Sequence, residues 1–224
     1  MKKEIEISIP QGYNDITLKK YLILQKELNN YEDNVEAQSA VLVTYLCGID
    51  TDILSGLGKQ DYNRISSELG KWISNTEFDL QRVITIDGVE YGFEPNLSNI
   101  SYGAYADITQ YGTLSIDENW AKVMSILYRP ITNRIRDTYE IQKYNGEINS
   151  DKFLDVSMDI HFGTLFFFVN LLTDLLKSTL NSTKVEEFPL NTKLILEKSG
   201  ALMQLSLNLP TETLKKLTEL LANH

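Results

Sequence analysis

The stretch that decides the fold runs from residue 84 to residue 131 and reads ITIDGVEYGFEPNLSNISYGAYADITQYGTLSIDENWAKVMSILYRPI. It opens with two β-rich runs joined by Asp87-Gly88. Asp-Gly favours a tight β-hairpin, because both central positions of the turn require positive φ. The spacing therefore predicts a hairpin over residues 82–93, closed by Pro95.

Two aromatic helical segments are expected after the hairpin. Asn99 or Ser101 is a candidate N-cap for the first and Asp117 for the second, and Pro130 is expected to end or kink the second helix. The whole stretch contains no His, no Cys and no glycine-rich phosphate loop. This composition indicates a surface that holds another protein rather than a reaction centre.

Elements on both sides of this stretch follow from periodicity. Residues 4–9, EIEISI, alternate as a half-buried strand does, and this strand is expected to pair with the hairpin in one small sheet. Residues 131–148 are mixed and polar and are expected to wrap the core. Helical patterns cover residues 14–29, 33–47, 50–57, 60–73 and 157–180, and a final helix is expected after Pro210.

The predicted fold class is mainly α with a small β element, an α+β protein with a helical bundle-like core. Two regions are expected, although they can also form one compact domain. Residues 1–80 would hold the amino-terminal strand and helices, and residues 81–224 would hold the hairpin and the carboxy-terminal helices.

Composition excludes several functional classes. The 224 residues carry a formal net charge of -10, which disfavours nucleic acid and anionic lipid as partners. Cys47 is the only cysteine, so no internal disulfide can form, and its apolar neighbours indicate a small buried side chain. The most apolar stretch, residues 162–176, is too short to span a membrane and contains Asn170 and Asp174.

No motif for catalysis, metal binding or cofactor binding is present. His161 and Asp159 are two residues apart, so they do not face each other on a helix, and a structural role is expected for His161. The run SGLGK (55–59) lacks both the earlier glycine and the Ser or Thr of a phosphate loop. Asp50 and Asp52 suit helix capping better than a calcium loop.

Aromatic and leucine-rich surfaces are the remaining candidates for a binding site. Tyr and Trp are favoured at protein interfaces because each joins a large apolar body to a polar tip. Leucines in the last predicted helix have the spacing of a helix–helix seam, over only about two heptads. The predicted protein-binding residues are Tyr102, Tyr105, Trp120, Leu127, Tyr128, Leu214, Leu217 and Leu221.

The order of segments carries a resemblance to a family. DITLKKY (15–21) opens a helix, LCGI (46–49) leads into an acidic turn that ends at Leu57, and Asp61-Tyr62 begins the next helix. This part resembles the small cytosolic tail assembly chaperones of tailed bacteriophages. The runs YGFEPNLSNISYGAYADI (91–108), WAKVMSILYRPI (120–131) and MDIHFGTLFFFVNLL (158–172) are similar to uncharacterised phage proteins encoded among virion genes.

The resemblance implies a mostly helical, non-enzymatic assembly factor in the host bacterial cytoplasm. Such chaperones bind the long, apolar, helical tape measure protein before the tail tube polymerises around it. The present chain is longer than typical members, and its hairpin is not part of their simplest pattern. No cofactor is implied, and no site residue transfers one to one.

Two other functional classes stay open at this stage. A structural virion protein, such as a head–tail connector or a packaged internal protein, would use its leucine face for permanent symmetric contacts, and a homo-oligomer is compatible with both readings. An enzyme with an unfamiliar site is the third class, and the sequence nominates no residue for it.

Overall fold

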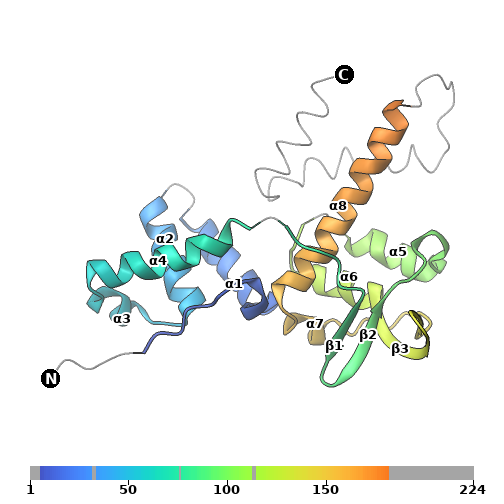
Figure 1. Cartoon of the computed structure of the whole chain (residues 1–224), viewed down its shortest axis with the longest axis horizontal. Coiled ribbons are helices and arrows are strands. Elements are labelled where there is room, and N and C mark those ends of the chain that lie inside the picture. Colours follow the sequence, from blue (N-terminus) through green and yellow to red (C-terminus); the bar gives the residue numbers. More distant parts are fainter. Residues whose placement is uncertain (1–5, 32–33, 76, 113–114, 182–224) are drawn as a thin grey trace. The chain divides into compact units, whose positions relative to one another are not determined.

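The computed structural model describes residues 6–31, 34–75, 77–112 and 115–181, with side chains up to residue 171. The protein is mostly helical with one four-stranded antiparallel sheet, which confirms the predicted fold class (Figure 1). The chain divides into two units. Unit 1 comprises Met1–Glu77 and Asp151–His161, and unit 2 comprises Phe78–Ser150 and Phe162–His224.

Most of unit 1 is helical. Its elements are the 3-10 turn η1 (Tyr13–Asp15), α1 (Leu18–Asn29), α2 (Val35–Cys47), α3 (Thr51–Gly56), α4 (Lys59–Ile73) and α7 (Asp151–Leu154). Side-chain caps begin three of the helices. Thr17 accepts from Lys20 N before α1, Asn34 accepts from Ala37 N before α2, and Asp50 accepts from Ile53 N before α3, at 3.3, 2.9 and 2.7 Å.

The segment 151–161 returns to unit 1 late in the sequence. Its main chain is held to the start of α1 by hydrogen bonds from Leu18 N to Val156 O (3.0 Å) and from Met158 N to Ile16 O (2.8 Å). The side chains of Ile16, Leu18 and Met158 are buried around these bonds. This closure depends on residues about 140 positions apart, so unit 1 is built from two separate segments of the chain.

Both strand pairs and the remaining helices belong to unit 2. The elements are β1 (Val83–Ile86), β2 (Val89–Phe93), the 3-10 turn η2 (Leu97–Asn99), α5 (Tyr102–Tyr111), α6 (Trp120–Leu127), β3 (Tyr128–Ile135) and β4 (Thr138–Ile141). Helix α8 (Met158–Asn181) begins in unit 1 and belongs to unit 2 from Phe162 onward.

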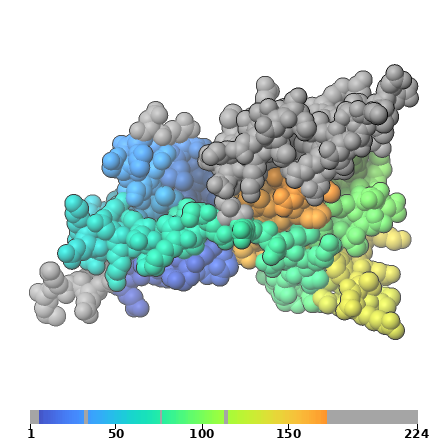
Figure 2. Space-filling model, turned by 45° about the horizontal axis from the view of Figure 1, so that its top comes forward, coloured from blue at the N-terminus to red at the C-terminus, as the bar shows by residue number. Residues whose placement is uncertain are grey.

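The predicted hairpin forms. Asp87 and Gly88 both have positive φ, 51° and 77°, and β1 pairs with β2 from Ile86↔Val89 to Val83↔Gly92. The sheet order is β1-β2-β3-β4, so the hairpin pairs with β3. Figure 2 displays the surfaces of the two strand pairs next to each other, β1–β2 in blue-green and β3–β4 in yellow.

Two expectations about strands are wrong. Residues 6–9 of the predicted amino-terminal strand are not in a strand, and residues 4–5 lie outside the described part. The partner of the hairpin is instead β3. Alternating apolar residues form a strand only where a neighbouring strand pairs with them. Because β3 occupies the position beside β2, residues 6–9 do not pair with the hairpin.

Pro130 has a different role from the predicted one. Helix α6 ends at Leu127, and Pro130 lies inside β3, opposite Tyr91. β3 is a central strand, where proline is unusual because it has no N–H for the ladder. The register of β3 against β4 shifts between Ile131 and Asn133, and such an irregularity accommodates local breaks in pairing. Within the segment 131–148, residues 131–135 and 138–141 are therefore in strands, and residues 142–148 are in neither a helix nor a strand.

The core of unit 2 lies between the sheet and the two helices α6 and α8. The Phe93 ring is nearly fully buried and makes edge contacts with the rings of Tyr128 and Phe167, with centroids 5.3 and 5.5 Å apart. Gly163 allows α8 to touch the main chain of Asp79, since a Cβ atom there would collide with the Asp79 carbonyl oxygen.

Candidate protein-binding surface

The exposed aromatic surface of unit 2 lies on α5. Ser101 caps this helix by accepting from Ala104 N at 3.3 Å, which confirms one of the two predicted caps. Tyr102 is 84% exposed and Tyr105 is 49% exposed, and their spacing of three residues makes them neighbours on one side of the helix. Ala104 is fully buried, so its small side chain marks the side of α5 that faces the protein.

α5 carries almost no charge. Asp107 is its one ionisable carboxylate, and the Tyr144 hydroxyl hydrogen-bonds to it. The pKa of Tyr144 is raised to about 12, first by burial and then by the neighbouring Asp107 carboxylate, so Tyr144 remains a neutral donor at physiological pH. The Tyr144 ring also lies 3.6 Å from the position that a Cβ atom on Gly103 would occupy. The segment after β4 thereby fixes α5.

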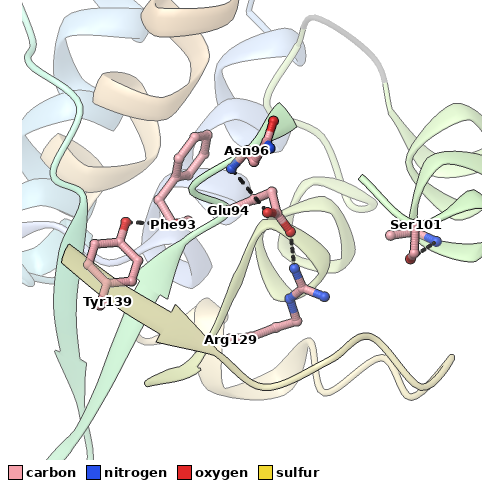
Figure 3. A network of polar contacts seen from close by, with 7 residues as sticks. Phe93, Glu94, Asn96, Ser101, Arg129 and Tyr139 are labelled. Atoms are coloured by element: carbon pink, nitrogen blue, oxygen red, sulfur yellow. Dashed lines mark hydrogen bonds and ion pairs between the residues drawn. The ribbon is translucent and has the colours of Figure 1, made fainter. Parts of the chain in front are cut away.

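A second polar network joins the sheet to the chain that leads into α5 (Figure 3). Glu94 accepts from the Arg129 guanidinium and from Asn96 N, the latter at 3.2 Å. The side chains of Arg129 and Glu94 are only 11% and 12% exposed. An ion pair this well buried is costly to break, because the charge left behind would have lost its partner and most of its water.

Tyr139 of β4 reaches across the sheet to β2 and to the residue that precedes β1. Its hydroxyl lies 2.7 Å from the Phe93 carbonyl oxygen and 3.1 Å from the Arg82 carbonyl oxygen, and it can donate to either (Figure 3). The ring lies directly over Gly92, where any Cβ atom would collide with it. These contacts hold residues 93–96 in place on the sheet, and this segment leads into α5.

Three of the predicted binding residues are core residues. Trp120, Leu127 and Tyr128 are 2%, 0% and 1% exposed. The reason is that α6 is buried on every side: each of its residues except Lys122 is buried, and the chain passes from Leu127 directly into β3. The Tyr128 hydroxyl donates to Gln81 O at 2.7 Å. A client surface built on these three side chains is therefore not available in this fold.

Only part of the predicted set is brought together. Tyr102 and Tyr105 lie side by side on α5 and are exposed, as a contact surface requires. Leu214, Leu217 and Leu221 lie outside the described residues. The exposed apolar residues Val89 (46%) and Ile135 (58%), at the ends of the two strand pairs, were not predicted. Both residues lie next to a two-residue turn, and a recognised turn would have placed them at the surface. The second turn, Arg136-Asp137, contains no glycine and was therefore not recognised.

His161 and Cys47, the two residues considered for catalysis, are buried or half-buried. His161 is fully buried, and its Nε2 lies 3.1 Å from the Phe153 carbonyl oxygen, a geometry in which neutral imidazole donates. Burial lowers the pKa of His161 to about 4. Burial also raises the pKa of the half-buried Cys47 thiol, which disfavours the reactive thiolate. Among the described residues, no three His, Cys, Asp or Glu side chains cluster as metal ligands would.

No protein-family model, no curated protein and no solved structure matches this chain. Over the residues that the structure describes, none of the helices combines the length and hydropathy that crossing a bilayer requires.

Proposed function

We propose that this protein is a non-enzymatic assembly factor that binds an apolar, helical client protein. The single observation that carries the proposal is the exposed pair Tyr102 and Tyr105 on α5. Exposed tyrosines give a large contact area with little loss of side-chain entropy, and their hydroxyls can hydrogen-bond at the edge of an apolar contact. A rigid, nearly uncharged helix face is suited to an amphipathic partner helix.

The proposed client class is a phage virion protein with long apolar helices, of which a tape measure protein is the leading example. The resemblance of residues 15–62 to tail assembly chaperones supports this choice. The net charge of -10 supports a carrier role, because a strongly charged chain keeps a complex with an apolar client dispersed. In this proposal the protein acts in the host bacterial cytoplasm, without cofactor or catalysis.

The test combines two measurements on the phage that encodes this chain. Mass spectrometry of purified particles asks whether the protein stays in the virion, and affinity purification from infected cells asks what it binds. The proposal expects absence from particles and recovery of the tape measure protein. A fixed copy number per particle would contradict it and would favour a structural virion protein.

Two variants show whether α5 is the surface that binds the client in the affinity purification. Tyr102→Ser with Tyr105→Ser removes the exposed pair on α5, and Tyr31→Ser removes a 42% exposed tyrosine of unit 1 as the matched control. We expect client recovery to fall at least tenfold in the first variant and to stay unchanged in the second. Equal recovery in both would exclude α5 as the client surface.

A further inference from the structure

β1 is an edge strand with an open backbone. The sheet order leaves β1 and β4 at its two edges. Phe93 N donates to Arg82 O at 2.8 Å, which makes residues 82 and 93 a hydrogen-bonded pair. Hydrogen-bonded pairs alternate along an antiparallel ladder, so the backbone groups of Ile84 point to β2 and those of Val83 and Thr85 point away from the sheet. No described main-chain group bonds to Val83 or Thr85 on that outer side.

The sequence of β1 does nothing to protect this edge. Edge strands are usually blunted by a charged residue, a proline or a bulge. β1 reads VITI and has none of these. β4, at the other edge, carries Glu140 and belongs to a ladder with a register shift. Thr85 is exposed and Val83 is half-buried, so the unprotected edge is the one that another strand can reach.

Charges at the two ends of β1 favour one particular occupant. The exposed Arg82 immediately precedes the strand, and the exposed Asp87 immediately follows it. When two identical strands pair antiparallel, the beginning of one lies beside the end of the other. In a pairing centred on Ile84, Arg82 of one copy lies one position from Asp87 of the second copy, so charges of opposite sign share each end of the contact. The strand itself contains no charge, so no like charges meet along it.

We propose that two copies of this chain associate through β1, which pairs antiparallel with β1 of the second copy about a twofold axis. The outward backbone groups fix the register. Val83 lies opposite Thr85 of the second copy, Ile84 lies on the axis, and four main-chain hydrogen bonds join the strands. The contact is short and lies below the size of a stable interface, so the dimer is weak and reversible. This association is independent of client binding at α5.

Sedimentation equilibrium of the full chain in about 0.15 M salt tests the proposal. The wild type is expected to rise from the monomer mass of 25.6 kDa toward twice that value as its concentration increases from about 5 µM to about 500 µM, a range suited to weak association. Thr85→Pro removes an N–H that points away from the sheet, so it blocks the edge and leaves the β1–β2 ladder intact. Thr85→Val keeps the N–H and is the matched control.

The expected result is that Thr85→Val associates like the wild type, while Thr85→Pro stays at the monomer mass of 25.6 kDa. Thr85→Lys is the second blocking variant, should the proline variant fail to fold, since a lysine on an edge strand disfavours pairing and the two lysines would be diagonal neighbours on one face of the dimer. A wild type that remains monomeric at 500 µM would overturn the proposal. Association of a folded Thr85→Pro or Thr85→Lys variant with unchanged affinity would also overturn it.

Discussion

Helices α5 and α6 are neighbours in sequence and both carry aromatic residues, yet these residues differ in exposure. α5 exposes Tyr102 and Tyr105, whereas α6 buries Trp120 completely. The difference follows from position. α6 runs directly into the central strand β3, so all its sides meet the protein, while α5 is attached through Ala104 and Asp107 and leaves one side free. An aromatic residue on a helix therefore indicates an interface only when that helix has an uncovered side.

The largest effect is expected from truncating the buried aromatic residue. Trp120→Ala should lower the free energy of unfolding by about 3–5 kcal/mol, because it opens a cavity in a fully buried site. Tyr102→Ala, the exposed counterpart on α5, should change it by less than about 0.5 kcal/mol. Urea denaturation measures both. A similar decrease in the free energy of unfolding in both variants would show that α5 and α6 do not differ in burial as described.

The same contrast applies to the two ion pairs of the sheet. Arg129→Leu should cost about 3 kcal/mol, since it leaves the buried Glu94 carboxylate unpaired. Arg134→Leu removes the partner of Glu90 from a pair whose side chains are about half exposed, and should cost less than about 1 kcal/mol. Denaturation at pH 7 compares them. The double variant Glu94→Leu with Arg129→Leu should recover part of the loss, and a further decrease would contradict the account of the buried pair.

His161 extends the contrast to a titratable group in unit 1. Its pKa is lowered from 6.5 to about 4 in the folded protein, so the unfolded chain binds more protons between these values. The free energy of unfolding is therefore highest above pH 6.5, where His161 is neutral in both the folded and the unfolded chain. It falls by up to about 3 kcal/mol as the pH decreases from 6.5 to 4, because only the unfolded chain takes up the proton. The measurement is the stability of the wild type and of His161→Gln across this range. Identical pH dependence in both proteins would rule out a role for His161.

The smallest effect concerns the attachment of α5. Tyr144→Phe removes the hydrogen bond to Asp107 and should cost about 1 kcal/mol. Tyr105→Phe removes a hydroxyl from the exposed side of the same helix and should be neutral. Hydrogen exchange of the α5 amides should become faster only in Tyr144→Phe. Faster exchange in Tyr105→Phe instead would mean that the exposed side of α5 is not free.

Sequence reasoning succeeded where the signal was local. Asp87-Gly88 carries its own turn geometry, Asp50 and Ser101 are caps, and α8 follows from a long apolar run. It failed where a distant partner decides the structure. The turn at Arg136-Asp137 places a non-glycine residue at a φ of 55°, and such a turn has no sequence signature. The hairpin of β3 and β4 was missed for that reason, so residues 4–9 were expected as the partner of the first hairpin in place of β3.

The candidate site was half predictable. Tyr102 and Tyr105 could be named from their residue type, but Trp120, Leu127 and Tyr128 were assigned to the same surface although they belong to the core. A usable signal was present. α6 has a single charged residue, Lys122, and a helix that is apolar all round is a buried helix. The spacing of Ala104, Ile108 and Tyr111 would likewise have identified the attached side of α5.

In the proposed function, the exposed side of α5 binds an apolar helical client. The most direct measurement is the affinity of the purified protein for a helical fragment of the tape measure protein, with Tyr102→Ser/Tyr105→Ser and Tyr31→Ser compared by isothermal titration calorimetry. We expect the double variant to bind at least tenfold more weakly, with an unchanged free energy of unfolding, and Tyr31→Ser to bind like the wild type. Binding of the folded double variant with wild-type affinity would contradict the proposed function.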